Sequence, residues 1–216
     1  MNNLSFTVRN ATQEDIEWLI ELRSFLLDGT SAIYASRSQT DSERWRTAYK
    51  HWLAAHLGVH DSVQVLVAEH CETRQVAGCA TGIIDLRAPT AANANGLSGW
   101  IQSVVVDPQW RAHGIATLLM NHLLRWFGNR DVATVALQTT AGASGLYERL
   151  GFCPTGEGLL LRQGRQHERI DYWPGLRRTA ISPSIRTCHK PSRCFDLYRI
   201  CRTTSESYAT ALLRLH

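Results

Sequence analysis

A strand that runs directly into a helix constrains this chain more than any other feature of its sequence. Residues 101–106 favour an extended strand, and a turn containing Pro108 follows them. A short loop with Arg111 and Gly114 then leads into a segment whose apolar residues recur at helical spacing. The free N–H groups and the dipole at the start of such a helix attract anions, and a glycine there lets the main chain approach a phosphate closely. The sequence therefore predicts an α/β protein with an anion site at this loop.

The loop matches neither of the two common phosphate-binding motifs. No Gly-Lys-Ser or Gly-Lys-Thr follows it, and the Gly-x-Gly-x-x-Gly pattern of dinucleotide-binding proteins is absent. Its pattern is Arg-x-x-Gly-x-Ala, from Arg111 to Ala116. An ordinary strand–helix connection with an exposed arginine would look the same, so the loop alone leaves that alternative open.

Two segments together carry a resemblance to a known family. Residues 101–116 resemble the acetyl-CoA-binding motif of the GNAT superfamily of N-acetyltransferases. Residues 140–152, which end in Leu-Tyr-Glu-Arg-Leu-Gly-Phe, resemble the second motif of that family. The resemblance is clear over residues 100–162, is weaker back to Phe6, and does not cover the last forty residues. It implies acetyl-CoA as co-substrate and a GNAT-like acyl-CoA N-acyltransferase fold, with a central mixed β-sheet flanked by helices.

Charge divides the chain into two parts. Residues 177–216 hold eight Lys/Arg and two Asp/Glu, which leaves fifteen and seventeen in residues 1–176. We interpret residues 1–176 as the GNAT N-acetyltransferase domain and residues 177–216 as a basic C-terminal extension. Because the domain is mildly acidic and has no basic stripe with interleaved aromatic residues, we expect no nucleic-acid partner.

The remaining composition indicates a cytoplasmic protein. No run approaches eighteen apolar residues, and the first five residues lack the basic start and apolar core of a secretory signal. We therefore expect no membrane partner and reduced thiols. Cys188, His189, Cys194 and Cys201 fit no standard zinc spacing, so we expect no metal. The sequence leaves the oligomeric state open, with a homodimer as one option.

Hydrophobic periodicity and turn residues predict the other elements. The predicted strands are residues 6–9, 63–70, 75–86, 100–106 and 132–138, with closing strands at 152–154 and 159–162. The predicted helices run from Thr12 to Leu27, from a capping box at residues 40–43 to Leu57, over 114–127, from a Thr140 cap to Leu150, and weakly over 197–215. Gly151 fits the left-handed position after the fourth helix.

The resemblance also implies cofactor contacts at individual positions. The main chain of Val104, Val105 and Val106 is expected to pair with the pantetheine arm as an added strand does. The residues expected to wrap the pyrophosphate are Arg111, Ala112, His113, Gly114, Ile115, Ala116 and Thr117. Many relatives carry Gly, Arg or Lys where this chain has Ala112 and His113, so fewer fixed charges face the phosphates here. Thr140 stands where many relatives have Asn, and either a cofactor contact or a helix cap explains it.

Acetyl transfer needs a neutral amine and a proton for the departing thiolate. An alkyl amine has a pKa of about 10.4, so its deprotonation at pH 7 costs roughly 4–5 kcal/mol. Some family members place a Glu on the central strand, which this chain lacks. The remaining candidates for the base are a water chain or one of the carboxylates Glu69, Asp85, Glu21 and Asp28. The resemblance implies that Tyr147 is the general acid, and a core aromatic residue is the alternative.

The first two predicted helices and their loop are acidic and aromatic, and we expect the acceptor amine there. The residues concerned are Asp28, Tyr34, Asp41, Glu43, Trp45, Tyr49 and Trp52. Such a surface suits a cationic amine through charge and cation–π contacts. We expect Asp28, Tyr34 and Gln102 to contact a small cationic molecule, such as an aminoglycoside or a basic peptide antibiotic. The alternatives are a peptide or protein N-terminal or lysine acetyltransferase, and a non-catalytic acyl-CoA-binding regulator.

Overall fold

The computed structural model describes residues 5–30, 32, 34–156 and 159. The chain divides into two units at residue 158, and every element below lies in the first, residues 1–158. The predicted strand residues 160–162, the predicted helix over 197–215 and the predicted domain boundary after residue 176 lie outside the described residues. None of the helices in the described part of the chain is both long and apolar enough to cross a membrane.

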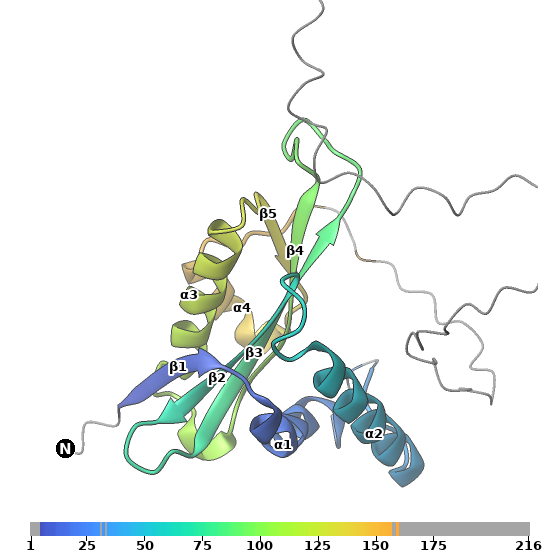
Figure 1. The fold of residues 1–216 in the computed structure, drawn as a ribbon, viewed down its shortest axis with the longest axis vertical. Helices are drawn as coiled ribbons and strands as arrows, with labels where there is room; N and C mark the ends of the chain where they lie inside the picture. The colour runs from blue at the N-terminus through green and yellow to red at the C-terminus, as the bar shows by residue number, and fades with distance from the viewer. Residues whose placement is uncertain (1–4, 31, 33, 157–158, 160–216) are drawn as a thin grey trace, which may run out of the picture. The chain divides into compact units, whose positions relative to one another are not determined.

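A five-stranded mixed sheet forms the centre of the molecule (Figure 1). In spatial order its strands are β1 (Phe6–Asn10), β2 (Val63–His70), β3 (Val76–Leu86), β4 (Leu97–Val106) and β5 (Thr134–Leu137). All neighbours are antiparallel except β4 and β5, which are parallel. The mixed sheet predicted from the sequence is therefore confirmed.

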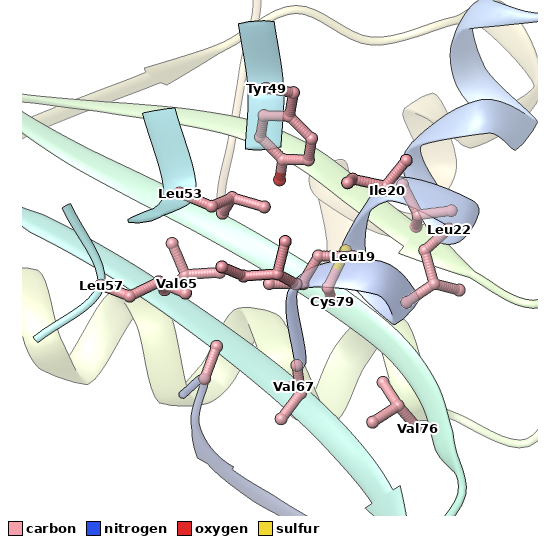
Figure 2. Packing of buried hydrophobic residues seen from close by; sticks show 13 residues of the cluster. Leu19, Ile20, Leu22, Tyr49, Leu53, Leu57, Val65, Val67, Val76 and Cys79 are labelled. Atoms are coloured by element: carbon pink, nitrogen blue, oxygen red, sulfur yellow. The ribbon is translucent and has the colours of Figure 1, made fainter. Parts of the chain in front are cut away.

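Helices cover both faces of the sheet. They are α1 (Ile16–Leu27), α2 (Gln39–His56), α3 (Ile115–Gly128) and the short α4 (Ser144–Arg149). Figure 1 shows α1 and α2 on one face of the sheet and α3 on the other. Alternate residues of β2 serve the two cores: Val65 and Val67 pack with α1 and α2, as Figure 2 shows, whereas Leu66 and Ala68 pack with α3. This alternation explains why the middle of the strand, from Val65 to Ala68, is apolar on both faces.

Several predicted boundaries differ from those observed. The predicted capping box at residues 40–43 is wrong, because α2 begins at Gln39 and its cap is Ser38, whose Oγ accepts from the Asp41 amide at 3.1 Å. Residues 152–154 form no strand. Thr140 makes no capping hydrogen bond with its side chain, and a 3₁₀ turn over Ala141–Ala143 separates it from α4. Gly151 does adopt the predicted left-handed conformation, with φ +88°.

β4 contains one more residue than β3 in the middle of their pairing. Thr81 pairs with Gln102 and Cys79 with Val105, so two residues of β4 lie opposite one residue of β3. Ser103, the first of those two, has φ +55°, in the left-handed region that L-residues seldom adopt. Together, the pairing and this angle identify a β-bulge in the central strand.

The bulge reverses the side-chain alternation along β4. Ile101 and Val105 are four residues apart, and in a regular strand they would face the same side of the sheet. Here Ile101 packs with α3, whereas Val105 packs with α1 and α2. The bulge therefore places Ile101 and Val105 in opposite cores.

β4 and β5 stay paired over only four residues. Their register runs from Ser98 opposite Thr134 to Ile101 opposite Leu137, where β5 ends. β4 continues to Val106, and no strand in the described part of the chain pairs with this edge beyond Ile101. The edge is therefore left open beside the bulge.

Asp28 joins α1 to α2. Its carboxylate accepts hydrogen bonds from Ser42 Oγ (2.7 Å), Trp45 Nε1 (3.0 Å) and Arg46 Nη2 (2.8 Å). Burial by itself would raise the pKa of Asp28, but these donors outweigh it and lower the pKa to about 2. Asp28 thus supports the helix pair in its ionised form.

We expect Asp28→Asn to lower the free energy of unfolding at pH 7 by up to about 2 kcal/mol. Because the folded-state pKa is depressed, this contribution is present above about pH 4 and disappears as the pH falls toward 2. Urea midpoints of the wild type and the variant should therefore converge in acid. Glu21→Gln is the matched control, since Glu21 is exposed and lies 3.7 Å from the same Arg46. An Asp28→Asn loss that is equal at all pH values would contradict this account.

Candidate functional site

A cavity of about 540 Å³ lies beside the open edge of β4. Its walls come from α1, α2, β4, the chain after β5 and α4. The lining residues are Arg23, Leu26, Leu27, Tyr34, Trp45, Trp100, Ile101, Gln102, Ser103, Val104, Leu137, Gln138, Thr139, Thr140, Ala143 and Tyr147. The cavity therefore occupies the point where the two parallel strands stop pairing.

The end of β4 leads from this cavity to the start of α3. Val104 lines the cavity, and Val105 is buried against α1 and α2. Val106 pairs with Gly78 of β3, and Ile115 at the start of α3 lies close to that glycine. A ligand that follows the strand edge from the cavity would thus reach the N-terminus of α3.

The loop before α3 presents its main chain at the N-terminus of this helix. Ala112 and Gly114 both have left-handed φ values, +64° and +76°, and Gly114 is the N-cap of α3. The amides from Ala112 to Thr117 make no hydrogen bond to an acceptor in the described part of the chain. A Cβ built on Gly114 meets no described protein atom within 4 Å. The loop therefore offers a run of unpaired donors and open space above Gly114.

The ring of His113 contacts main-chain carbonyl groups of this loop. Its Nδ1 lies 2.8 Å from the carbonyl oxygen of Arg111 and 3.1 Å from that of Trp110. A protonated Nδ1 donates to these carbonyls and leaves Nε2 for an external partner. The side chains of Arg111 and His113 are both exposed beside the unpaired amides.

Tyr147 lies both in the core and at the cavity. Its side chain is 8% exposed, packs at right angles to Phe152 with ring centroids 6.0 Å apart, and lines the cavity. Burial raises the pKa of Tyr147, so its hydroxyl stays protonated at neutral pH. The two interpretations of Tyr147 given above, core aromatic and proton donor, are therefore compatible.

The carboxylates proposed as the base do not line the cavity. Glu69 is buried in β2, with Oε2 2.9 Å from Nη2 of Arg9 and Oε1 2.6 Å from Nη1 of Arg74. Asp85 is exposed near the end of β3. Glu21 and Asp28 both lie near Arg46 at the junction of α1 and α2 described above. None of the four carboxylates is among the residues that line the cavity.

Arg23 is the site residue that sequence reasoning missed. It lies half-buried on α1, lines the cavity, and donates through Nη1 to Ser103 Oγ at the bulge. In the sequence it recurs at the same helical spacing as the apolar residues of its helix, which favours a core-facing position. A charged residue at a core-facing position of a helix was the sequence signal that could have identified Arg23 as a site residue.

The structure thus brings together Tyr34, Gln102, Val104, Thr140 and Tyr147 of the predicted site. The family model for the acetyltransferase (GNAT) family matches residues 24–152, more than half of the chain. This chain belongs to the GNAT family. As a member, it is an acetyl-CoA-dependent N-acetyltransferase.

Solved structures of GNAT proteins share the fold. A predicted acetyltransferase from Clostridium acetobutylicum, solved with acetyl-CoA, is 24% identical, with a TM-score of 0.60 over 73% of this chain and 96% of its own. A GCN5-related N-acetyltransferase from Ralstonia eutropha is 23% identical, with a TM-score of 0.61 over 74% and 100%. An aminoglycoside N-acetyltransferase solved with CoA is 18% identical, with a TM-score of 0.57 over 75% and 97%. No curated protein sequence matches this GNAT protein.

Ala112 provides a test of the loop geometry in this GNAT protein. A left-handed alanine is disfavoured by roughly 1 kcal/mol relative to glycine, so Ala112→Gly should raise the free energy of unfolding by up to about 1 kcal/mol. Ala48→Gly, on the exposed middle of α2, should lower it by about 0.5–1 kcal/mol. Opposite shifts of the two melting temperatures are expected. A loss of stability in both variants would contradict a left-handed Ala112.

Proposed function

We propose that this chain transfers the acetyl group of acetyl-CoA to a primary amine of a small molecule in the cavity beside β4. The observation that carries the proposal is the run of unpaired amides from Ala112 to Thr117, joined to the cavity by the open edge of β4. The cofactor pyrophosphate binds these amides, with Arg111 and His113 beside it. Each helix-terminal contact contributes about 0.3–1 kcal/mol, and up to about 2 kcal/mol when partly buried.

The pantetheine arm runs along the open edge of β4. Val104, Val105 and Val106 supply main-chain groups there, as in the addition of a strand to a sheet. The absence of a partner strand beyond Ile101 in the described part of the chain supports this placement. Thr140 lines the cavity opposite β4 and contacts the cofactor from that side.

The transfer itself forms one bond and breaks one. The neutral amine nitrogen attacks the thioester carbonyl carbon, the new N–C bond forms, and the C–S bond breaks. Tyr147 gives its phenolic proton to the leaving thiolate and regains one from water. The amine loses its proton to water in the cavity, because the described lining contains no carboxylate. Glu69 and Asp85 have no part in this scheme.

The acceptor is a small amine with aromatic contacts. Tyr34, Trp45 and Trp100 line the cavity, which supports Tyr34 and Gln102 as acceptor contacts. The polycationic acceptor predicted from sequence relied on the acidic residues Asp28, Asp41 and Glu43, none of which is among the lining residues. Three donors of α2 occupy Asp28. The only charged side chain in the described lining is Arg23. These features support a less cationic amine better than an aminoglycoside or a basic peptide antibiotic.

An amine panel tests the proposal through release of free CoA. The panel should contain small neutral amines, amino acids, aminoglycosides, peptides with free N-termini, and lysine peptides. We expect turnover of small amines. Turnover restricted to peptides would favour a peptide or protein acetyltransferase, and tight acetyl-CoA binding without turnover would favour a regulator. Preferred acetylation of aminoglycosides would restore the antibiotic-modifying hypothesis.

Tyr147→Phe tests the proton donor. We expect kcat to fall by about 100-fold or more, in the range typical of general acid catalysis. The affinity for acetyl-CoA, measured by calorimetry, should stay within twofold, because the aromatic packing against Phe152 is retained. Because burial raises the pKa of Tyr147, the wild-type rate should not decline through this group between pH 7 and pH 9. An unchanged kcat in the variant would remove Tyr147 from the mechanism.

A further inference from the structure

We infer that the acceptor amine carries an anionic oxygen group, a carboxylate or a phosphate, and that Arg23 binds this group. The inference rests on the proposed function, since it concerns the acceptor in the same cavity. Arg23 projects from α1 and lines the cavity together with Gln102 and Ser103 of β4. It is therefore the residue that gives the acceptor end of the site its charge.

The guanidinium is held in place by two contacts. Its Nη1 donates to Ser103 Oγ at the bulge, and its Cζ lies 4.4 Å from the ring centroid of Tyr49. Ser103 and Tyr49 are both buried, with 8% and 7% of their surfaces exposed. Buried neighbours on two sides fix the orientation of the guanidinium, so it is organised before a ligand arrives.

Arg23 has no carboxylate partner within the described part of the chain. Arg9, Arg46, Arg74 and Arg87 each lie within 4.0 Å of a carboxylate oxygen, and Arg23 does not. A guanidinium has five N–H donors in a planar fork, which matches the two oxygens of a carboxylate or a phosphate. A half-buried cation with free donors that faces a cavity is a site for such a group.

The titratable groups beside Arg23 do not supply the missing negative charge. Burial raises the pKa of the Cys79 thiol to about 12, against the opposing effect of Arg23. Burial also raises the pKa of Tyr49, so both groups are neutral at pH 7. The counter-ion for Arg23 must therefore come from outside these neighbours.

The walls around Arg23 strengthen binding of an anion. Leu26, Leu27, Trp45 and Trp100 line the same cavity, and apolar surroundings weaken the screening of a charge pair. The same charge disfavours an acceptor with several ammonium groups. Arg23 thus selects a molecule with one amine for transfer and one anionic group for anchoring.

The test compares acceptors that differ only in the anchoring group. An ω-amino carboxylic acid, its carboxamide, the aminoalkyl phosphate and the diamine of equal length are offered to the wild type and to Arg23→Gln. We expect the wild-type kcat/KM for the carboxylate or the phosphate to exceed that for the carboxamide by at least about 10-fold. The faster of the two anionic acceptors identifies the group that binds.

Arg23→Gln distinguishes an arginine that binds the anionic group of the acceptor from one that only stabilises the bulge. Arg23→Gln should raise KM for the anionic acceptor by about 10- to 100-fold more than it raises KM for the carboxamide. Arg23→Lys should retain part of the preference, because it keeps the charge and loses the fork. An arginine that only supports the bulge would change all acceptors alike. A wild-type preference for the carboxamide or the diamine, or an unchanged preference in Arg23→Gln, would overturn the inference.

Two controls keep this result separate from the proposed function. If Arg23→Gln does not fold, the wild-type preference among the four acceptors decides the question. If no amine is acetylated, the proposed function fails. In that case the CoA-saturated wild type is titrated calorimetrically with an alkyl carboxylate and an alkyl phosphate that lack the amine. These titrations decide whether Arg23 binds an anionic group. Binding of either anion supports Arg23 as an anion site, and binding of neither overturns it.

Discussion

The extra residue in β4 is the constraint on which the rest of this structure depends. In a regular strand Ile101 and Val105 would enter the same core, because residues four apart face the same side of a sheet. The left-handed Ser103 changes this by reversing the alternation between Ile101 and Val105. It also turns a hydroxyl toward Arg23. Core packing and site geometry therefore follow from the same distortion.

The open edge of β4 beyond the bulge is the second feature that determines the site. Unpaired strand edges normally invite pairing with another chain, so a protein that leaves one at its centre needs an occupant for it. Here the edge adjoins a cavity at one end and the N-terminus of α3 at the other. A long ligand whose polar, amide-containing arm is joined to a diphosphate matches both ends of the edge. The fold family and the local geometry agree on this point.

Much of this architecture could be predicted from sequence, because it depends on local periodicity. The strands at 63–70 and 76–86 and the helices α1 and α3 lie within a few residues of their predicted positions. The start of α2 was missed because Ser38 and Thr40 are both good caps, and sequence alone does not choose between them. Nothing in the identity of Ser103 signals a positive φ. The bulge therefore required the pairing with β3 to be seen.

The site was less predictable than the fold, since its composition depends on tertiary contacts. Glu69 and Asp28 resemble free acids in the sequence, and only the structure shows that arginines and other donors engage them. For Arg23 the error is the reverse. Its helical spacing suggested a packed core position, whereas in the structure it lines the cavity.

The central claim is that the loop before α3 binds a diphosphate through its main chain. Calorimetric titration with CoA and with pantetheine, which lacks the diphosphate and the phosphoadenosine joined to it, tests it in the wild type and in Gly114→Ala, a change confined to the loop. We expect CoA to bind the wild type at least about 100-fold more tightly than pantetheine does. In Gly114→Ala most of this difference in affinity should be lost. The added Cβ meets no described protein atom within 4 Å, but an alanine at φ +76° strains the main chain, so the test uses the ratio of the two affinities and not the affinity for CoA alone. Equal affinities for CoA and pantetheine in the wild type would contradict the claim.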